Sequence, residues 1–277
     1  MKSEMSDQIR ISRRTALGRA CAIFFLLGNT KGPDRIQLQH GETGRVSRII
    51  DGDSFVLDSQ GEEISVRLSS IQAPRLANDF DKAWPYAKEA KDALSALISN
   101  RHVELLYGKT KRDRYERAIA QVYSLNPDGQ KDLWIQAEML RLGLARVYSW
   151  RGDNADIIAL YALEEEARQN QRGIWSDDFY AIRSPDPDPL AQYVDSVQIV
   201  EGIIISTADV RGRIYLNFGA NYKTDFTVAI ARKHVRAFDA IDPLSLAGAR
   251  VRVRGWIELF NGPMIWIDHP DRLEILS

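Results

Sequence analysis

The sequence lacks the features that mark several large classes of protein. Its 277 residues include one cysteine, Cys21, which excludes disulfides within the chain and metal sites built from several cysteines. Basic and acidic residues balance at 37 against 38, so any phosphate-binding site must be a local patch. The N-terminal apolar run at 20–28 is too short to span a bilayer, which needs about 20 residues.

The overall composition is that of an ordinary globular protein. Hydrophobic residues make up 44% and charged residues 27% of the chain. These values exclude a wholly disordered chain, a fibrous repeat and a polytopic membrane protein. The length is enough for two small domains of about 100–200 residues each.

Residues 1–43 are interpreted as an export segment and leader. Arg13 and Arg14 precede the apolar run at 20–28, an arrangement that resembles a twin-arginine export signal. The alternative is a disordered tail with an accidental apolar cluster. The first interpretation predicts an exported protein, periplasmic or secreted, which loses its only cysteine if the segment is removed.

Residues 44–183 show the pattern of an α+β domain that is mostly β. Runs rich in β-branched and aromatic residues predict strands, and 3.6-residue periodicity predicts helices. The predicted strands are 46–50, 54–57, 64–68, 102–106 and 117–124, and the predicted helices are 87–98, 133–142 and 157–171. This order predicts a small mixed barrel flanked by helices.

Residues 184–195 are predicted to be a proline-rich linker, because Pro185, Pro187 and Pro189 favour a semi-rigid, extended segment. A second domain is predicted over 196–277. Its predicted strands are 197–205, 214–218, 226–230, 250–257 and 264–267, with a short helix at 232–240. Three strands, a helix and two strands is the order of an OB-type barrel.

Two carboxylates flank a glycine in Asp51-Gly52-Asp53, between two predicted strands. Carboxylate oxygens are ligands that a hard divalent cation prefers. Asp-Gly is also a common turn dipeptide, so the motif fits a hairpin turn as well as a metal site.

Basic residues raise the possibility of a phosphate site in two places. Arg67 lies in a predicted strand, where it is either a surface charge or a guanidinium directed into a cleft. Residues 109–117 hold five basic and two acidic groups. That run fits a solvated loop, or a phosphate-facing loop that carries Tyr115 for stacking on bases.

Several motifs together resemble the staphylococcal nuclease (thermonuclease) family over 44–183. In chain order they are Asp51-Gly52-Asp53-Ser54, Val66-Arg67-Leu68, Ala73-Pro74, Asp113-Arg114-Tyr115-Glu116-Arg117, Gly143-Leu144-Ala145-Arg146-Val147-Tyr148 and Gly173-Ile174-Trp175-Ser176. The resemblance implies a five-stranded OB barrel with three helices. It also implies a calcium-dependent phosphodiesterase that acts on DNA or RNA.

The family's functional residues carry over only in part. Asp53 matches its first calcium-binding aspartate, and Arg67 and Arg117 match its two phosphate-binding arginines. Gln72 stands where the family has its second calcium-binding aspartate, and Arg75 stands where it has the glutamate that acts as general base. The resemblance therefore implies a metal site of Asp53, Gln72 and the backbone carbonyl of Ala73.

The two departures weaken the case for catalysis. A glutamine oxygen brings no charge to a metal site. Arg75 cannot take a proton from water and would repel a cation, although it can add a third guanidinium for phosphate. An altered phosphodiesterase and an inactive module that binds nucleic acid or another phosphate ligand both stay open, as does a purely structural protein. If the protein does cleave, the candidate bases are the nearby carboxylates Asp51, Asp79, Asp81 and Glu89.

The C-terminal part resembles, less specifically, the OB-like modules that follow some bacterial thermonuclease-like domains. The resemblance rests on 213–219, 253–257 and 261–263. Tyr215, Phe218 and Trp256 are interpreted as core aromatics or, alternatively, as stacking platforms for bases. His234 and His269 have no ligand spacing around them and are interpreted as surface or packing residues.

Overall fold

The structure is a computed structural model that describes residues 37–79, 82–152 and 155–276. Most of the predicted export segment, including Arg13, Arg14 and Cys21, lies outside the described residues, as does Asp81. Among the helices of the described part, none has the length and apolar character needed to cross a membrane.

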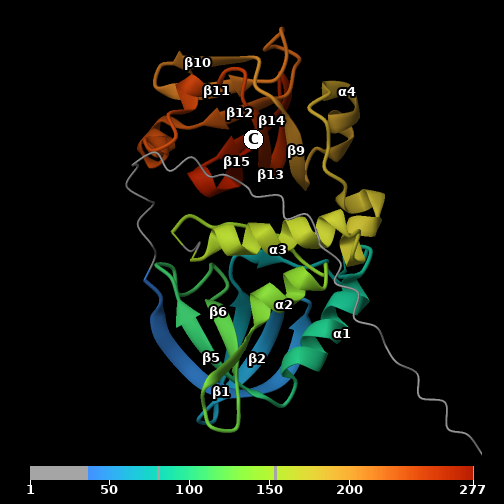
Figure 1. The fold of residues 1–277 in the computed structure, drawn as a ribbon, viewed down its shortest axis with the longest axis vertical. Helices are drawn as coiled ribbons and strands as arrows, with labels where there is room; N and C mark the ends of the chain where they lie inside the picture. Colours follow the sequence, from blue (N-terminus) through green and yellow to red (C-terminus); the bar gives the residue numbers. More distant parts are fainter. Residues whose placement is uncertain (1–36, 80–81, 153–154, 277) are drawn as a thin grey trace, which may run out of the picture. The chain divides into compact units, whose positions relative to one another are not determined.

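A ring of strands forms the first domain. Its strands are β1 (Gln39–Asp51), β2 (Ser54–Ser59), β3 (Glu62–Leu68), β5 (His102–Tyr107), β6 (Ala118–Leu125) and β7 (Lys131–Trp134). Five of them follow the order β3-β2-β1-β5-β6, with β7 beside β6 (Figure 1). A parallel pairing of β3 with β6 closes the ring, which confirms the predicted barrel of five strands.

Three helices cover this ring, as the sequence predicts: α1 (Ala87–Ile98), α2 (Ile135–Arg141) and α3 (Ile157–Gln169). Helix α1 places Ala90, Leu94 and Ile98 on one buried face, because residues three or four positions apart share a side of a helix. Two short strands, β4 (Ile71–Gln72) and β8 (Arg146–Val147), pair outside the ring.

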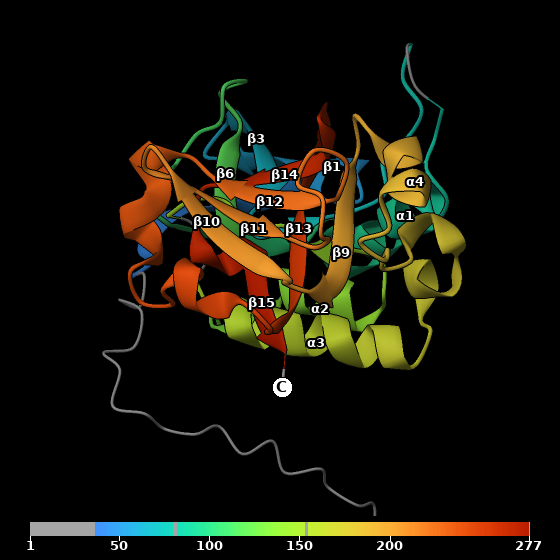
Figure 2. The same cartoon turned by 90° about the horizontal axis from the view of Figure 1, so that it is seen from above.

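A second sheet domain follows. Its strands are β9 (Val197–Ile203), β10 (Ser206–Val210), β11 (Arg213–Asn217), β12 (Thr227–Ile230), β13 (Arg250–Phe260), β14 (Gly262–Ile267) and β15 (Leu273–Leu276). They follow the order β10-β11-β12-β14-β13-β15, and β9 pairs with β13. Figure 2 shows β10, β11 and β12 side by side. A second β domain is confirmed, whereas its identity as an OB barrel stays a prediction.

Short helical turns complete the chain. They are η1 (Gly173–Ser176), η2 (Asp178–Tyr180), α4 (Pro187–Leu190), η3 (Ala191–Tyr193), η4 (Arg232–Phe238), η5 (Pro243–Leu246) and η6 (Pro270–Arg272). The prediction of an extended linker is wrong at Pro187–Leu190, which form the helical turn α4. Proline is tolerated in the first turn of a helix, where its missing N–H has no partner to lose.

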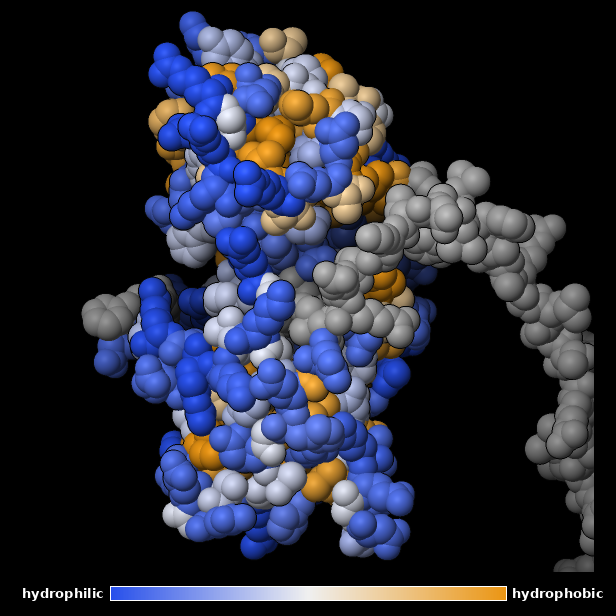
Figure 3. All heavy atoms as spheres, turned by 90° about the vertical axis from the view of Figure 1, so that its left-hand side faces the viewer, coloured by the Kyte–Doolittle hydropathy of each residue, from blue (hydrophilic) through white to orange (hydrophobic). Residues whose placement is uncertain are grey.

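The apolar residues form two separate buried clusters. One lies within residues 46–160 and the other within residues 190–273. The predicted linker at 184–195 overlaps the second cluster, because Leu190 is one of its members, and the domain bounds stay a prediction. Figure 3 shows apolar side chains gathered on the second domain, while the same face of the first domain is mainly hydrophilic.

Two glycines make a close contact beneath α2 and α3. Gly143 follows α2 with a φ of +66°, and a Cβ there would lie 2.2 Å from the carbonyl oxygen of Arg172. Gly173 has a φ of +53°, and its N-terminal neighbour Arg172 follows α3 closely. The amide of Ile174 donates to the carbonyl of Gly143 at 2.8 Å, so the ends of both helices are joined through this contact.

We expect Gly143→Ala to destabilise the protein by more than Gly61→Ala. Gly61 also has a positive φ, +88°, but a Cβ there meets no atom within 4 Å. Gly61→Ala therefore costs only the free energy of placing a Cβ-bearing residue in the left-handed region, about 1–2 kcal/mol. Gly143→Ala adds a steric clash with the carbonyl oxygen of Arg172. Urea denaturation measures both free energies of unfolding, and equal losses would contradict the close contact.

Candidate functional site

An open cleft of about 980 Å³ lies on the first domain. The ends of β1 and β3, the start of β2 and the loops after β4, before β6 and after β8 contribute to it. Its ionisable and amide side chains are those of Asp51, Asp53, Arg67, Gln72, Arg75, Asn78, Arg112, Asp113, Arg114 and Arg117. The structure therefore brings together the sequence-predicted side chains of this site, whose individual roles stay predictions.

Asp53 is held in the tight turn between β1 and β2. A Cβ on its neighbour Gly52 would lie 2.7 Å from the Cβ of Ala90, so only glycine fits there. The Asp53 carboxylate accepts hydrogen bonds from the Ser54 hydroxyl and the Ala73 amide, both at 3.0 Å. The motif is thus a hairpin turn that also directs a buried carboxylate into the cleft.

Arg67, at the end of β3, pairs with Asp53. Its Nη2 lies 3.3 Å from Asp53 Oδ2, and its Nη1 donates to Asp53 Oδ1 at 3.5 Å. Its Nε is buried and has no hydrogen-bond partner in the structure. Because this nitrogen is enclosed, a ligand in the cleft would meet the terminal nitrogens of Arg67 rather than its Nε.

Gln72 is engaged with a second buried arginine. β4 pairs with β8, which sets Gln72 opposite Arg146. Gln72 Oε1 accepts from Arg146 Nε at 3.1 Å and from Arg146 Nη2 at 2.8 Å. Burial lowers the pKa of Arg146 to about 10. The amide oxygen that the resemblance assigns to a metal ion is therefore already occupied by a guanidinium.

Arg75 is exposed at the cleft and is oriented by an aromatic ring. Its guanidinium carbon lies 5.2 Å from the centroid of the Trp84 ring, a cation–π distance. The Trp84 amide donates to the Arg75 carbonyl at 2.9 Å, which fixes the loop between them. Arg75 makes no ion pair with any carboxylate of the described residues.

Arg117 is braced by Asp113 and by Tyr115. Its Nε and Nη2 both lie 2.7 Å from Asp113 Oδ2. Burial alone would raise the pKa of Asp113, but the hydrogen bonds from Arg117 and the backbone N–H of Tyr115 lower it below its ordinary value. The exposed Tyr115 ring lies under the guanidinium groups of Arg114, at 4.7 Å, and Arg117, at 5.4 Å.

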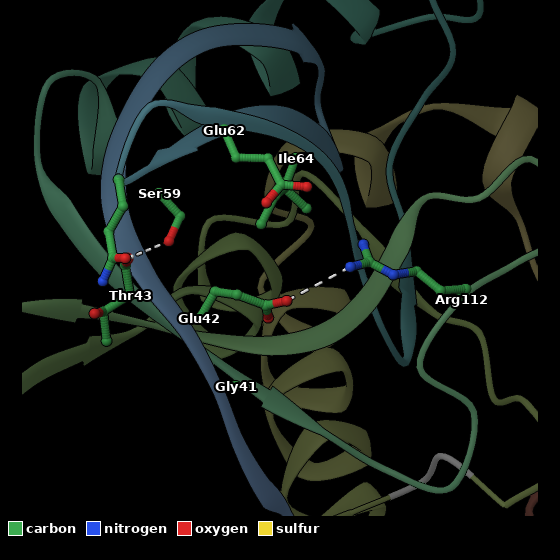
Figure 4. A pocket seen from close by; sticks show the side chains of 8 residues that line it. Gly41, Glu42, Thr43, Ser59, Glu62, Ile64 and Arg112 are labelled. Carbon is green, nitrogen blue, oxygen red and sulfur yellow. Dashed lines mark hydrogen bonds and ion pairs between the residues drawn. The ribbon is translucent and has the colours of Figure 1, made fainter.

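Arg112 also lines the cleft, but its charge is directed elsewhere. Figure 4 shows it pointing across a neighbouring hollow toward Glu42, at 3.5 Å. The Tyr107 hydroxyl donates to the same carboxylate at 2.5 Å. In that hollow the Ser59 hydroxyl donates to the carbonyl of Thr43. These contacts stabilise the edge of the ring and do not converge on a point where a ligand would react.

Asp51 is the other carboxylate near Asp53 in the cleft. Burial and the charge of Asp53 raise its pKa, against the hydrogen bond from the Gly52 amide. Of the other bases considered from sequence, Asp79 and Glu89 are exposed and do not contribute to the cleft lining. Asp51 is therefore the one such base that the described residues place in the cleft.

The residues present do not fit the calcium site that the resemblance implies. Within the described ranges, no group of three or more His, Cys, Asp or Glu side chains is arranged to hold a metal ion. Asp53 is committed to Arg67, Ser54 and Ala73, and Gln72 is committed to Arg146. Of the other two carboxylates in the lining, Asp113 is paired with Arg117 and only Asp51 lies near Asp53, and positively charged Arg75 opens onto the same cleft.

Sequence reasoning missed three side chains of this site. Tyr148 and Trp150 line the cleft, and their rings meet edge to face at 5.1 Å. Arg146, which holds Gln72, lies 74 residues from it in sequence. Tyr148 and Arg146 belong to a family motif in the sequence, but only the pairing of β4 with β8 reveals what they contact.

Comparisons with known proteins agree with this fold. The family model described as staphylococcal nuclease homologue matches residues 65–177. The chain is 36% identical over 134 residues to an uncharacterized endonuclease of Escherichia coli, covering 48% of this chain and 77% of that protein. It is 28% identical over 141 residues to a thermonuclease of Staphylococcus hyicus, covering 49% and 77% respectively.

A fungal relative extends the comparison. The chain is 36% identical over 118 residues to the probable endonuclease LCL3 of Leptosphaeria maculans, covering 41% of this chain and 38% of that protein. The residues that the family model matches fall on the domain that carries the cleft. With the closed ring of five strands, the cleft arginines and an Escherichia coli relative matched over most of its length, the chain belongs to the staphylococcal nuclease family.

Proposed function

We propose that this protein binds DNA or RNA through phosphodiester groups held by the arginines of the cleft, and hydrolyses them slowly. The observation that carries the proposal is the Arg67 guanidinium, which lines the cleft and is held there by Asp53. Arg117 and Arg75 line the same cleft. Guanidinium groups donate paired hydrogen bonds that match phosphate oxygens.

The charges of the lining favour an anion. The cleft lining has five arginines and three aspartates. Arg67 and Arg117 pair with two of those aspartates and Arg112 pairs with Glu42, so Arg75 and Arg114 are the lining arginines without an ion pair to a described carboxylate, against Asp51. Tyr115, Tyr148 and Trp150 add aromatic surfaces on which bases can stack. Clustered arginines and aromatic rings are the combination that binds single-stranded nucleic acid without reading its sequence.

Slow hydrolysis follows from the missing base. Arg75 stands at the family's glutamate position and cannot accept a proton from water. General-base catalysis contributes about 10²–10⁴ in rate, so losing it leaves only positioning and charge stabilisation by the arginines.

A second candidate function rests on Asp51. Its carboxylate lines the cleft near Asp53, and its raised pKa suits proton transfer better than that of an ordinary aspartate. In this alternative the protein is an active phosphodiesterase with a relocated base. For either function, export to the periplasm or the medium remains a proposal that rests on the N-terminal sequence.

We expect little calcium-dependent cleavage by the unmodified protein, and faster cleavage by the double variant Gln72→Asp with Arg75→Glu. The carboxylate introduced at position 72 meets the guanidinium of Arg146, so the second substitution is needed to add negative charge facing the cleft. The increase in cleavage rate is expected to lie within the roughly 10²–10⁴-fold that a general base supplies. Release of fragments from labelled DNA and RNA measures it.

Gln72→Asp with Arg75→Gln is the matched control, because it keeps the first substitution and removes the positive charge of Arg75 without adding a base there. Equal acceleration by this control would assign the effect to charge alone. Strong cleavage by the unmodified protein, lost in Asp51→Asn and kept in Arg75→Gln, would contradict slow hydrolysis and establish the second candidate.

We expect Arg117→Gln to weaken binding of single-stranded DNA about tenfold or more, the effect of losing charge-assisted hydrogen bonds to phosphate. Arg101→Gln removes the same charge from an exposed position that does not line the cleft, and should change affinity little. Fluorescence anisotropy of a labelled strand in a chelator measures both affinities. Equal losses in the two variants would show that binding depends on overall charge and not on the cleft.

A further inference from the structure

One wall of the cleft is a short segment, residues 146–151, whose side chains alternate between the cleft and the buried interior. Tyr148 and Trp150 line the cleft, and Arg146 holds the cleft residue Gln72. Between them, Val147 and Ser149 are buried: the Val147 side chain packs in the apolar cluster of the first domain, and the Ser149 hydroxyl contacts His269 of the second domain. Alternation is expected of extended backbone, where successive side chains point to opposite sides.

Arg254, from β13 of the second domain, holds the backbone of this segment. Its Nη1 donates to the Val147 carbonyl at 3.0 Å. Its two terminal nitrogens also donate to Glu164 of α3, at 3.1 and 2.9 Å, and Glu164 in turn accepts from the Val147 amide at 2.7 Å. Arg254 and Glu164 are each only 4% exposed, so both polar groups of Val147 depend on a buried ion pair between the domains.

His269 holds the next inward-facing residue. Its Nε2 lies 2.8 Å from the Ser149 hydroxyl, and its Nδ1 lies 2.7 Å from Asp268 Oδ1. The hydrogen bond from His269 lowers the pKa of Asp268 to about 2, so this carboxylate stays charged and orients the imidazole.

The order of hydroxyl, imidazole and carboxylate is that of a hydrolase nucleophile and its base. A nucleophile must also reach its substrate, yet Ser149 is only 2% exposed and is not part of the cleft lining. The hydrogen bonds among these three groups therefore hold the segment at 146–151 in place, and the groups do not form a catalytic triad.

A further contact reaches a cleft residue directly. The Arg272 guanidinium carbon lies 5.6 Å from the centroid of the Tyr148 ring. Nearby, the Tyr161 hydroxyl of α3 donates to the Asp271 carbonyl, which ties the turn η6 to the first domain. The second domain thus contacts the cleft wall at Val147, Tyr148 and Ser149 in succession.

We propose that Arg254 and His269 are positioning residues that fix Tyr148 and Trp150 in the nucleic-acid cleft, so that the second domain is an integral part of the site. This inference rests on the proposed function, since it assigns the two rings a part in binding nucleic acid. Neither Arg254 nor His269 touches the nucleic acid; each acts through the segment at 146–151.

The test uses full-length Ser149→Ala and His269→Leu, their double variant, and His102→Leu as control. Ser149→Ala deletes one oxygen, so it should fold even if His269→Leu does not. His102 is exposed on β5 and lies outside the cleft lining, which makes it a matched loss of one imidazole. Two readouts are compared: affinity for labelled single-stranded DNA, and hydrogen exchange of the backbone amides at 146–151.

We expect Ser149→Ala and His269→Leu each to weaken DNA binding about fivefold, the factor that one net hydrogen bond provides, and the double variant to lose no more than either alone. Exchange should rise at 146–151 while the amides of β1 to β3 keep their protection. His102→Leu should change neither readout.

Unchanged affinity and exchange in Ser149→Ala would overturn the proposal. So would an equal rise of exchange across the whole first domain, because that indicates a general loss of stability. If the unmodified protein fails to bind DNA, the proposed function is wrong, and the positioning of the two rings in a nucleic-acid site is wrong with it. Binding by the unmodified protein with no selective change at 146–151 leaves the proposed function intact and rejects this inference alone.

Discussion

The parallel pairing of β3 with β6 is the constraint on which the cleft depends. It closes the ring and sets Arg67 opposite Ile119, two residues beyond Arg117. The Leu68 amide donates to the Asp53 carbonyl at 2.9 Å, which brings the β1–β2 turn to the same point. Two arginines and an aspartate from distant parts of the sequence therefore meet because the barrel closes there.

Once these groups meet, the remaining substitutions decide the chemistry of the site. In this chain the Gln72 oxygen accepts from Arg146, and Arg75 is stacked on Trp84 with its charge open to the cleft. Under the function proposed above, neither residue attracts a cation, and the cleft of this chain suits phosphate rather than a metal ion with a carboxylate base.

The second domain adds to this cleft through polar contacts and not through a shared apolar core. The apolar clusters of the two domains are separate, whereas Arg254 and Glu164 form a buried ion pair between them. Removing one partner of a buried pair leaves an uncompensated charge, which is strongly destabilising. The ion pair between Arg254 and Glu164 therefore requires accurate geometry. The segment that it holds, 146–151, carries the Tyr148 and Trp150 rings that line the cleft.

Much of this fold could be predicted from sequence, because strands such as β2 and β3 carry their own apolar pattern and α1 carries its own periodicity. Strands β4, β8 and β10 could not, since two of them have only two residues and Ser206–Val210 is largely polar and exposed. The four-residue strands β7 and β15 are also not predicted, and the predicted helix at 133–142 is wrong at Leu133 and Trp134, which belong to β7. The turn at Pro187–Leu190 depends on the burial of Leu190 in the second core, which local sequence does not reveal.

In the site, too, some features could be predicted from local sequence and others depend on distant contacts. Spacing identifies Asp53, Arg67 and Arg117, because each lies in a local motif. The partner of Gln72 and the role of His269 depend on contacts 74 and 120 residues away in sequence, which no local pattern encodes. The sequence predicts a surface or packing role for His269; the residue is buried, and its contact with Ser149 gives that packing a specific purpose.

The central claim is that guanidinium groups, and not a calcium ion, hold the phosphodiester in this cleft. Its most direct test is a calorimetric titration of the unmodified protein with single-stranded DNA, in a chelator and then in calcium. We expect the same affinity in both, because Arg67, Arg75 and Arg117 supply the positive charge. Binding that appears only when calcium is present would contradict it.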